Sequence, residues 1–239
     1  MTGNVLVAGA GSTLARAVAE GLARRGHGLV LAARDAAEAE RTAADLRLRF
    51  RVPAAALGFD ARDAGATASL VPQAEAALPG GLAGVVVAFA AMPDQEEIER
   101  DGAAGLAMID VNVRSTMALL ESAAALLQAR PGSFLCAFSS VAGDRGRRKN
   151  YAYGATKAAL STAMEGLSAR LAPKGVTVLC VKPGPADSAM TWGLFPSPPL
   201  LAPPDTVARD VLSALSRGRS VVYTPWFWRP IMAVLRALP

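Results

Sequence analysis

Histidine and cysteine are nearly absent from this chain of 239 residues, which has one histidine and two cysteines. His27 falls in an expected helix-to-strand turn, where we predict a solvated side chain. Zinc hydrolase and histidine-base mechanisms therefore lose most of their support, and no metal site is predicted. Cys136 and Cys180 each lie in an apolar, strand-like run, so we expect buried, reduced thiols rather than a disulfide.

Long charged runs and a signal segment are also missing. The net charge is +5, but the arginines are spread along expected helices instead of clustering between aromatic residues, so no nucleic-acid partner is predicted. An anionic cofactor or substrate explains this charge equally well. The chain begins in an expected strand without a basic and then apolar leader, which favours a cytoplasmic location.

Apolar residues make up 52% of the chain, enough to bury a substantial core in a single domain over residues 1–239. Apolar, β-rich runs alternate with helical patterns. Strands are expected at residues 4–8, 28–33, 54–59, 84–89, 133–138, 176–181 and 220–223. One helix is expected to end near residue 25, and further helices are expected at 103–129, 151–171 and 205–216. This alternation predicts an α/β fold: a Rossmann-type, doubly wound, mainly parallel sheet of seven strands with helices on both faces.

A glycine-rich turn over residues 9–15 connects the first strand to an alanine-rich helix. Glycines at such a turn let the backbone approach a pyrophosphate, and the helix N-terminus adds N–H donors and a positive dipole end. A plain tight turn is the alternative. The residues expected to bind a dinucleotide here are Gly9, Gly11, Ser12, Thr13 and Leu14.

The end of the second strand indicates which cofactor binds. An NAD site would place a carboxylate there for the ribose hydroxyls, but this chain has Ala33 followed by Arg34. Asp35 and Glu38 form a capping-box pattern, which would use the Asp35 carboxylate at a helix start. Arg34 is then free to bind a 2′-phosphate, so NADP (NADPH) is predicted over NAD. An exposed arginine at a helix end is the alternative.

Three residues carry the predicted chemistry. Tyr153 and Lys157 are four residues apart on the helix expected at 151–171, so they share a face. A cation beside a phenol favours the phenolate, and we expect Lys157 to lower the pKa of Tyr153 and make it a usable proton donor. Tyr151 has no lysine four positions later. Ser140, which follows the fifth strand, could bind the same substrate oxygen.

This serine, tyrosine and lysine, together with the glycine turn and Pro183-Gly184, resemble the short-chain dehydrogenase/reductase family along nearly the whole chain. The resemblance implies an enzyme that transfers a hydride between NADP and a small carbonyl or alcohol substrate. The chain also departs from the family pattern. Ala8, Thr13 and Ala15 replace a threonine and two glycines of the glycine motif, and Ala88-Phe89-Ala90-Ala91 stands in place of Asn-Asn-Ala-Gly.

The resemblance also assigns individual roles. Asn112 is implied to bend the helix at 103–129 and to hold a water of a proton relay, as a fourth catalytic residue. Asp60 is implied to contact the adenine edge, with a simple helix cap as the alternative. Ser188 replaces the threonine that orients the nicotinamide amide. The further cofactor contacts implied are Asp60, Ala61, Ala90, Tyr153, Lys157, Pro183, Gly184, Ala186 and Ser188.

Three segments near the expected site have open assignments. Residues 185–204 are proline-rich and irregular, contain Trp192, Leu194 and Phe195, and are predicted to form a substrate lid. Residues 226–238 are amphipathic and too short to span a bilayer; they fit peripheral membrane contact or packing onto a partner subunit. A basic cluster is either a solvated turn or a contact for an anionic substrate group, and it consists of Arg145, Arg147, Arg148 and Lys149.

The family resemblance implies a homodimer or homotetramer. Two other functions are carried as alternatives. One is a degenerate scaffold or sensor that binds dinucleotide without turnover, favoured by the altered glycine motif and the missing asparagines. The other is a membrane-surface reductase of a lipid-linked keto substrate, suggested by the aromatic residues Trp226, Phe227 and Trp228 near the C-terminus.

Overall fold

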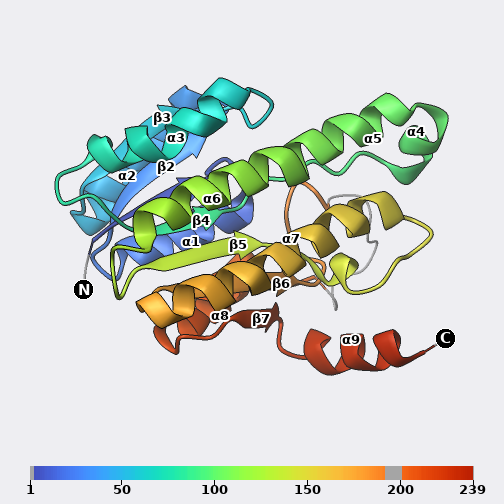
Figure 1. Ribbon diagram of the computed structural model, residues 1–239. Helices are drawn as coiled ribbons and strands as arrows, with labels where there is room; N and C mark the ends of the chain where they lie inside the picture. The colour runs from blue at the N-terminus through green and yellow to red at the C-terminus, as the bar shows by residue number, and fades with distance from the viewer. Residues whose placement is uncertain (1–2, 192–200, 239) are drawn as a thin grey trace.

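The computed structural model describes residues 3–191 and 201–238. Seven strands form one sheet in the order β3-β2-β1-β4-β5-β6-β7, and every pair of neighbours is parallel (Figure 1). The strands are β1 Asn4–Ala8, β2 Gly28–Ala33, β3 Ala54–Gly58, β4 Leu82–Val87, β5 Phe134–Phe138, β6 Thr177–Pro183 and β7 Val221–Thr224. The predicted doubly wound sheet is confirmed.

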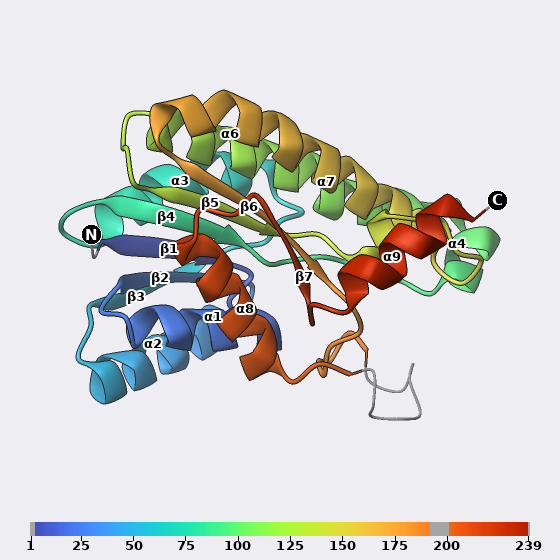
Figure 2. The ribbon, with the colours of Figure 1, turned by 90° about the horizontal axis from the view of Figure 1, so that it is seen from below.

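Helices cover both faces of this sheet, as Figure 2 shows. Alternate strand residues such as Val5 and Leu6 point to opposite faces, so each face needs its own apolar cover. On one face lie α1 Thr13–Ala23, α2 Ala36–Phe50 and α8 Pro204–Ser216, and on the other α3 Ala64–Ala77, α6 Thr116–Leu127 and α7 Tyr151–Leu171. The strand order reverses between β1 and β4, and ligands of such sheets bind beyond the carboxyl ends of the strands at that point.

The long helix expected at 103–129 consists of three consecutive segments: α5 Gly102–Ile109, a π-helical stretch Asp110–Ser115, and α6. Asn112 lies in the π-helical stretch, where the resemblance implied a bend. By length and composition, Gly102–Leu127 is the one stretch of the described residues that resembles a membrane span. Its buried side packs into the core beside α3 and α7, as a long core helix does.

The C-terminal segment folds back onto the carboxyl end of the sheet. After β7, helix α9 Trp228–Ala237 packs Trp228 and Met232 against Val141. Val141 begins η2 Val141–Gly143, a 3₁₀ turn directly after Ser140; a second such turn, η3 Ala172–Lys174, follows α7. A short helix, α4 Gln95–Arg100, precedes α5. The inner, apolar side of α9 therefore packs into the protein's own core.

The structure also places the two cysteines and the histidine of the chain. Cys136 and Cys180 are buried and free, as predicted, and burial raises the pKa of both thiols. His27 lies in the expected turn but is only partly exposed, with Nδ1 3.0 Å from the carbonyl oxygen of Gly3. The predicted solvated side chain is therefore exposed only in part, because its ring contacts the backbone just before β1.

Candidate active site

A cleft of about 1260 Å³ lies at the carboxyl ends of the strands. It contains every predicted cofactor residue and the three predicted catalytic residues other than Asn112. The predicted residues that line it are Gly9, Gly11, Ser12, Thr13, Leu14, Arg34, Asp60, Ala61, Ala90, Ser140, Tyr153, Lys157, Pro183, Gly184, Ala186 and Ser188. Of the predicted lid, only residues 185–191 and 201–204 are described, and Trp192, Leu194 and Phe195 lie outside the described residues.

The glycine turn has the backbone geometry that a dinucleotide needs. Gly9 has a φ of +91°, and a Cβ there would lie 2.7 Å from the backbone nitrogen of Phe89, so only glycine fits. A Cβ on Gly11 would meet no protein atom within 4 Å. Ser12 directly precedes α1, and its side chain makes no capping bond, which leaves the first N–H groups of the helix for a ligand. These residues fit a pyrophosphate.

Aromatic packing replaces the asparagines that the chain lacks after β4. The N–H of Ala88 donates to the carbonyl of Ala8 at 2.8 Å, which continues the ladder. The rings of Phe89 and Phe59 are 5.4 Å apart between centroids. The strand end is therefore held by backbone pairing and apolar contact, and the lost side-chain hydrogen bonds do not disrupt it.

Asn112 holds the segment after β4 against α7. Its Oδ1 accepts from the N–H of Ala91 at 2.7 Å, and its Nδ2 donates to the carbonyl of Ala91 at 2.8 Å and to Oγ1 of Thr156 at 3.1 Å. Both Nδ2 protons are used, so this buried amide is satisfied by protein groups. Asn112 does not line the cleft, and its role in holding a relay water stays a prediction. Thr156, which the sequence analysis did not single out, completes the contact.

Two glycines let the loop after β5 lie directly on α7. A Cβ on Gly143 would be 2.7 Å from the backbone carbon of Lys157, and a Cβ on Gly154 would be 2.7 Å from the carbonyl oxygen of Ala142. This close approach brings the Ser140 hydroxyl to the side of Tyr153, where it acts to lower the pKa of the phenol. The Ser140 hydroxyl also accepts from the N–H of Ala142 at 3.1 Å.

The expected effect of Lys157 on Tyr153 is wrong for the structure as it stands. Burial raises the pKa of Tyr153, and the hydrogen bond with Ser140 only partly opposes this. Lys157 is 4% exposed and donates through Nζ to the carbonyl of Phe138 at 2.7 Å, 5.6 Å from the centroid of the Tyr153 ring. The phenol is therefore held as a protonated donor at neutral pH.

Burial lowers the pKa of Lys157 from 10.5 to about 8, which predicts a pH-dependent stability. Between these values the unfolded chain binds more protons than the folded protein, so stability should rise with pH. Relative to Lys157→Met, the wild type should gain on the order of 2 kcal/mol of unfolding free energy between pH 7 and pH 10. Urea unfolding of both proteins at several pH values measures this difference, and a difference that stays constant would contradict the lowered pKa.

At the far end of the cleft, Arg34 is exposed and makes no hydrogen bond or ion pair with any described residue. The nearby carboxylates are already engaged. Asp35 caps α2 by accepting from the N–H of Glu38 at 2.9 Å, as predicted, and the Glu38 carboxylate pairs with Arg16. Asp60 pairs with Arg62 at 2.6 Å, whose guanidinium lowers the pKa of Asp60 to about 2.

The alternative that Asp60 is a helix cap is wrong. The residue that caps α3 is Asp63, whose carboxylate accepts from the N–H groups of Gly65 and Ala66. Asp60 lies in the cleft lining, where its contact with an adenine edge stays a prediction.

A buried ionic cluster that sequence reasoning missed connects the Ser140 loop to the sheet. Lys182 Nζ lies 2.6 Å from Asp144 Oδ1, and the Tyr223 hydroxyl donates to Asp144 Oδ2 at 2.7 Å. Asp144 directly follows the 3₁₀ turn Val141–Gly143, and Ser140 directly precedes it. The three residues of this cluster come from separate segments of the chain, so no local spacing in the sequence identifies them.

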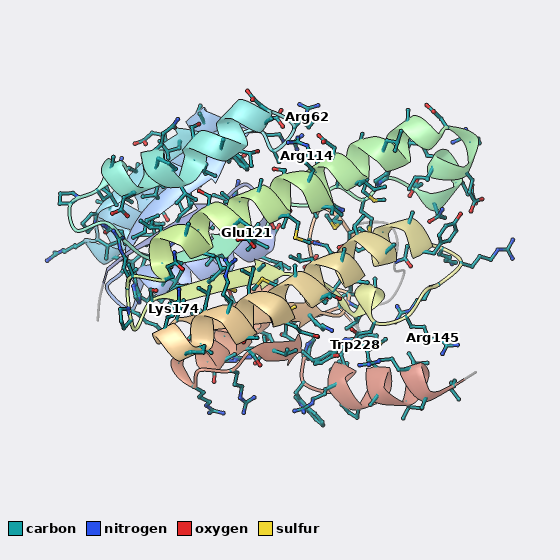
Figure 3. The ribbon with its side chains drawn as sticks, viewed as in Figure 1. Arg62, Arg114, Glu121, Arg145, Lys174 and Trp228 are labelled. Atoms are coloured by element: carbon teal, nitrogen blue, oxygen red, sulfur yellow. The ribbon has the colours of Figure 1, made fainter. Side chains whose placement is uncertain are left out.

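Helix α9 packs against the loop that follows Ser140 and against Gly184 after β6 (Figure 3). The Trp228 indole occupies the space where a side chain on Gly184 would lie. Arg145 donates to the carbonyls of Leu235 and Leu238 at 2.8 and 2.6 Å, at the end of α9. The C-terminal segment therefore buttresses the walls of the cleft.

The all-parallel, doubly wound sheet, with its glycine turn and cleft at the switch point, defines the class of Rossmann-type nucleotide-binding proteins. Comparison with known proteins narrows this class. The family model described as short chain dehydrogenase matches residues 3–198. An uncharacterised oxidoreductase of Mycobacterium tuberculosis is 37% identical over 229 residues, covering 96% of this chain and 89% of the relative. An uncharacterised oxidoreductase of Streptomyces coelicolor is 31% identical, covering 99% of this chain and 92% of the relative.

Solved structures agree on the fold. A short-chain dehydrogenase from Sphingobium yanoikuyae in complex with NADPH has a TM-score of 0.83 at 23% identity, covering 99% of this chain and 96% of that one. A short-chain dehydrogenase from Burkholderia cenocepacia in complex with NADP has a TM-score of 0.82 at 24% identity, covering 93% and 96%. The chain belongs to the short-chain dehydrogenase/reductase family of oxidoreductases.

Proposed function

We propose that this protein is an NADP-dependent oxidoreductase that interconverts a carbonyl and a secondary alcohol. The observation that carries the proposal is the convergence of Ser140, Tyr153 and Lys157 on one cleft beside the glycine turn. When bound, the cofactor supplies or takes the hydride. The protein's part is to place the carbonyl and to handle its proton.

In the reduction direction, Tyr153 donates its phenolic proton to the carbonyl oxygen, because burial keeps that proton in place at neutral pH. Ser140 lines the same cleft as Tyr153 and donates to the same oxygen when substrate binds. Lys157, held by the carbonyl of Phe138, supplies a buried amine beside the phenol and binds the nicotinamide ribose. Asn112 fixes the segment that faces them through Ala91.

The purified protein, incubated with NADPH and a panel of keto-sugars, steroids and acyl thioesters, tests this function. A carbonyl-dependent loss of NADPH absorbance is the expected result. Tight NADPH binding without turnover on any member would instead support the alternative of a scaffold or sensor, which the altered residues Ala8, Thr13 and Ala15 of the glycine motif favour.

Arg34 supports the choice of NADP, in agreement with the NADPH and NADP named for the two solved structures. Arg34→Gln should weaken NADPH binding about 10-fold or more and leave NADH binding nearly unchanged, because a charge-assisted bond to the 2′-phosphate is lost. Titration of both cofactors by fluorescence measures this without turnover. Arg41→Gln, an equal charge change on an exposed residue outside the cleft, is the control. Equal loss of NADPH and NADH affinity in Arg34→Gln would contradict the assignment.

We also propose that the protein self-associates as a dimer or tetramer. Leu106 and Ile109 on α5 are 69% and 47% exposed, an apolar face that a second copy would cover. Light scattering measures the mass in solution.

A membrane-surface enzyme for lipid-linked keto substrates is the second candidate. Trp226, Val234 and Leu238 are 76%, 62% and 53% exposed around α9, near Arg229 and Arg236. If the wild type bound anionic vesicles only weakly, and if Trp226→Ser and Val234→Ser left this binding unchanged, the result would count against this candidate. Truncation from Trp226 is a poor test, because Trp228 and Met232 are buried in the core.

A further inference from the structure

The part of the cleft near Tyr153 is mostly apolar. Tyr153 packs in one cluster with Met108, Met92 and Ala90, and Ala104 and Ala107 of α5 also line the cleft. The charged residues at the other end, from Arg34 to Arg62, follow β2 and β3. A substrate that reaches Tyr153 therefore meets an apolar wall.

Among the described residues, one cation besides Lys157 interrupts this wall. Arg147, on the loop between η2 and α7, lines the same cleft as Ser140 and Tyr153 and is partly buried. Its Nη2 lies 3.4 Å from the sulfur of Met232, and a thioether sulfur is a weak acceptor. No described carboxylate pairs with Arg147. Most of the five donors of this guanidinium are therefore left for a ligand.

The neighbours of Arg147 explain why it is not neutralised. Asp144, three residues earlier, is already bonded to Lys182 and Tyr223 and is 2% exposed. Arg145 is bound to the end of α9. Arg148 and Lys149 are exposed and do not line the cleft. Glu97 of α4 does line the cleft, but it is exposed and makes no ion pair with Arg147 or any other described residue.

We propose that the substrate is a carbonyl compound with an apolar body and one anionic oxygen group, a carboxylate or a phosphate, and that Arg147 binds this group. This inference rests on the proposed function and names the substrate class for the same cleft. Arg147 forks onto two anionic oxygens, while the apolar wall takes the body and orients the carbonyl toward Tyr153.

Matched pairs of ketones test this substrate class. Alkyl and aryl keto acids, such as 4-oxo-4-phenylbutanoate, are each compared with their methyl esters by kcat/KM with NADPH. We expect the wild type to prefer the acids, and Arg147→Gln to reduce the acid-to-ester ratio of kcat/KM about 10-fold. Arg147→Lys should retain part of the preference, because it keeps the charge but loses the fork. Arg148→Gln, on the same loop but outside the cleft lining, should not change the ratio.

Calorimetric titration of the keto acids in the presence of NADP gives a second readout that needs no turnover. Acid binding that is lost in Arg147→Gln, with no ketone reduced, would refute the proposed function but keep the anion site. Reduction of ketones without any acid preference in the wild type, or with the same preference in Arg147→Gln, would overturn the inference. A parallel series with keto phosphates distinguishes the two anions. Glu97→Gln should leave the preference in place or increase it, since Glu97 is the one carboxylate among the described residues that line this part of the cleft.

Discussion

Tyr153→Phe should reduce turnover by about 10²- to 10⁴-fold and leave cofactor affinity unchanged. The substitution removes only the hydroxyl that donates the proton. The ring itself is 8% exposed and packs against Met108 and Ala142, contacts that phenylalanine keeps. The measurements are kcat on any ketone that the wild type reduces, and NADPH binding by fluorescence titration.

Tyr151→Phe is the matched control for this prediction. Tyr151 stands two residues earlier on the same helix, but it is 48% exposed, and among the described residues its hydroxyl contacts only Glu99, at 3.4 Å. It should turn over at the wild-type rate. If Tyr153→Phe also remained active, the catalytic assignment of Tyr153 would be wrong, whatever the fold.

Asp144→Asn should lower the free energy of unfolding by about 3 to 5 kcal/mol, because it leaves the Lys182 ammonium buried without its carboxylate. Asp144 and Lys182 are 2% and 9% exposed. Burial by itself lowers the pKa of Lys182, but the hydrogen bond and charge of Asp144 outweigh it and leave that pKa raised. Urea unfolding monitored by circular dichroism measures the loss.

The double variant Asp144→Asn with Lys182→Met separates a lost ion pair from general damage. Removing both charges should recover part of the stability, since no uncompensated ion remains. Glu121→Gln is the control, because Glu121 pairs with Arg170 at the surface, where the two side chains are 60% and 45% exposed; its effect should stay below about 1 kcal/mol. An Asp144→Asn protein as stable as this control would contradict the role of the buried cluster.

Much of the fold follows from local pattern. Helix α7 has the predicted bounds, Tyr151–Leu171, and each predicted strand overlaps an observed one, because alternation of apolar runs and helical periodicity is written in neighbouring residues. The glycine turn and Arg34 could also be identified from the sequence, because each directly follows a predicted strand. Strand ends were less accurate: β4 begins at Leu82, two residues before the predicted start, since pairing with β1 extends the strand.

The candidate site was only partly readable. The four-residue spacing of Tyr153 and Lys157 put both residues in one cleft as expected, but spacing does not report burial, and burial sets the pKa of both groups. Likewise, the sequence showed Asn112 inside a helix, whereas its partners Ala91 and Thr156 come from other parts of the chain.

The sequence by itself determined the order of strands and helices, the glycine turn and the types of residue available for proton transfer, because these depend on near neighbours and on fixed helical and strand periods. Only the tertiary structure decided which groups are dehydrated and which charges meet: Asp144 with Lys182 and Tyr223, Trp228 against Gly184, and Arg147 in the cleft without a carboxylate. Those contacts join residues far apart in the chain, and their energies depend on burial, which no local pattern encodes.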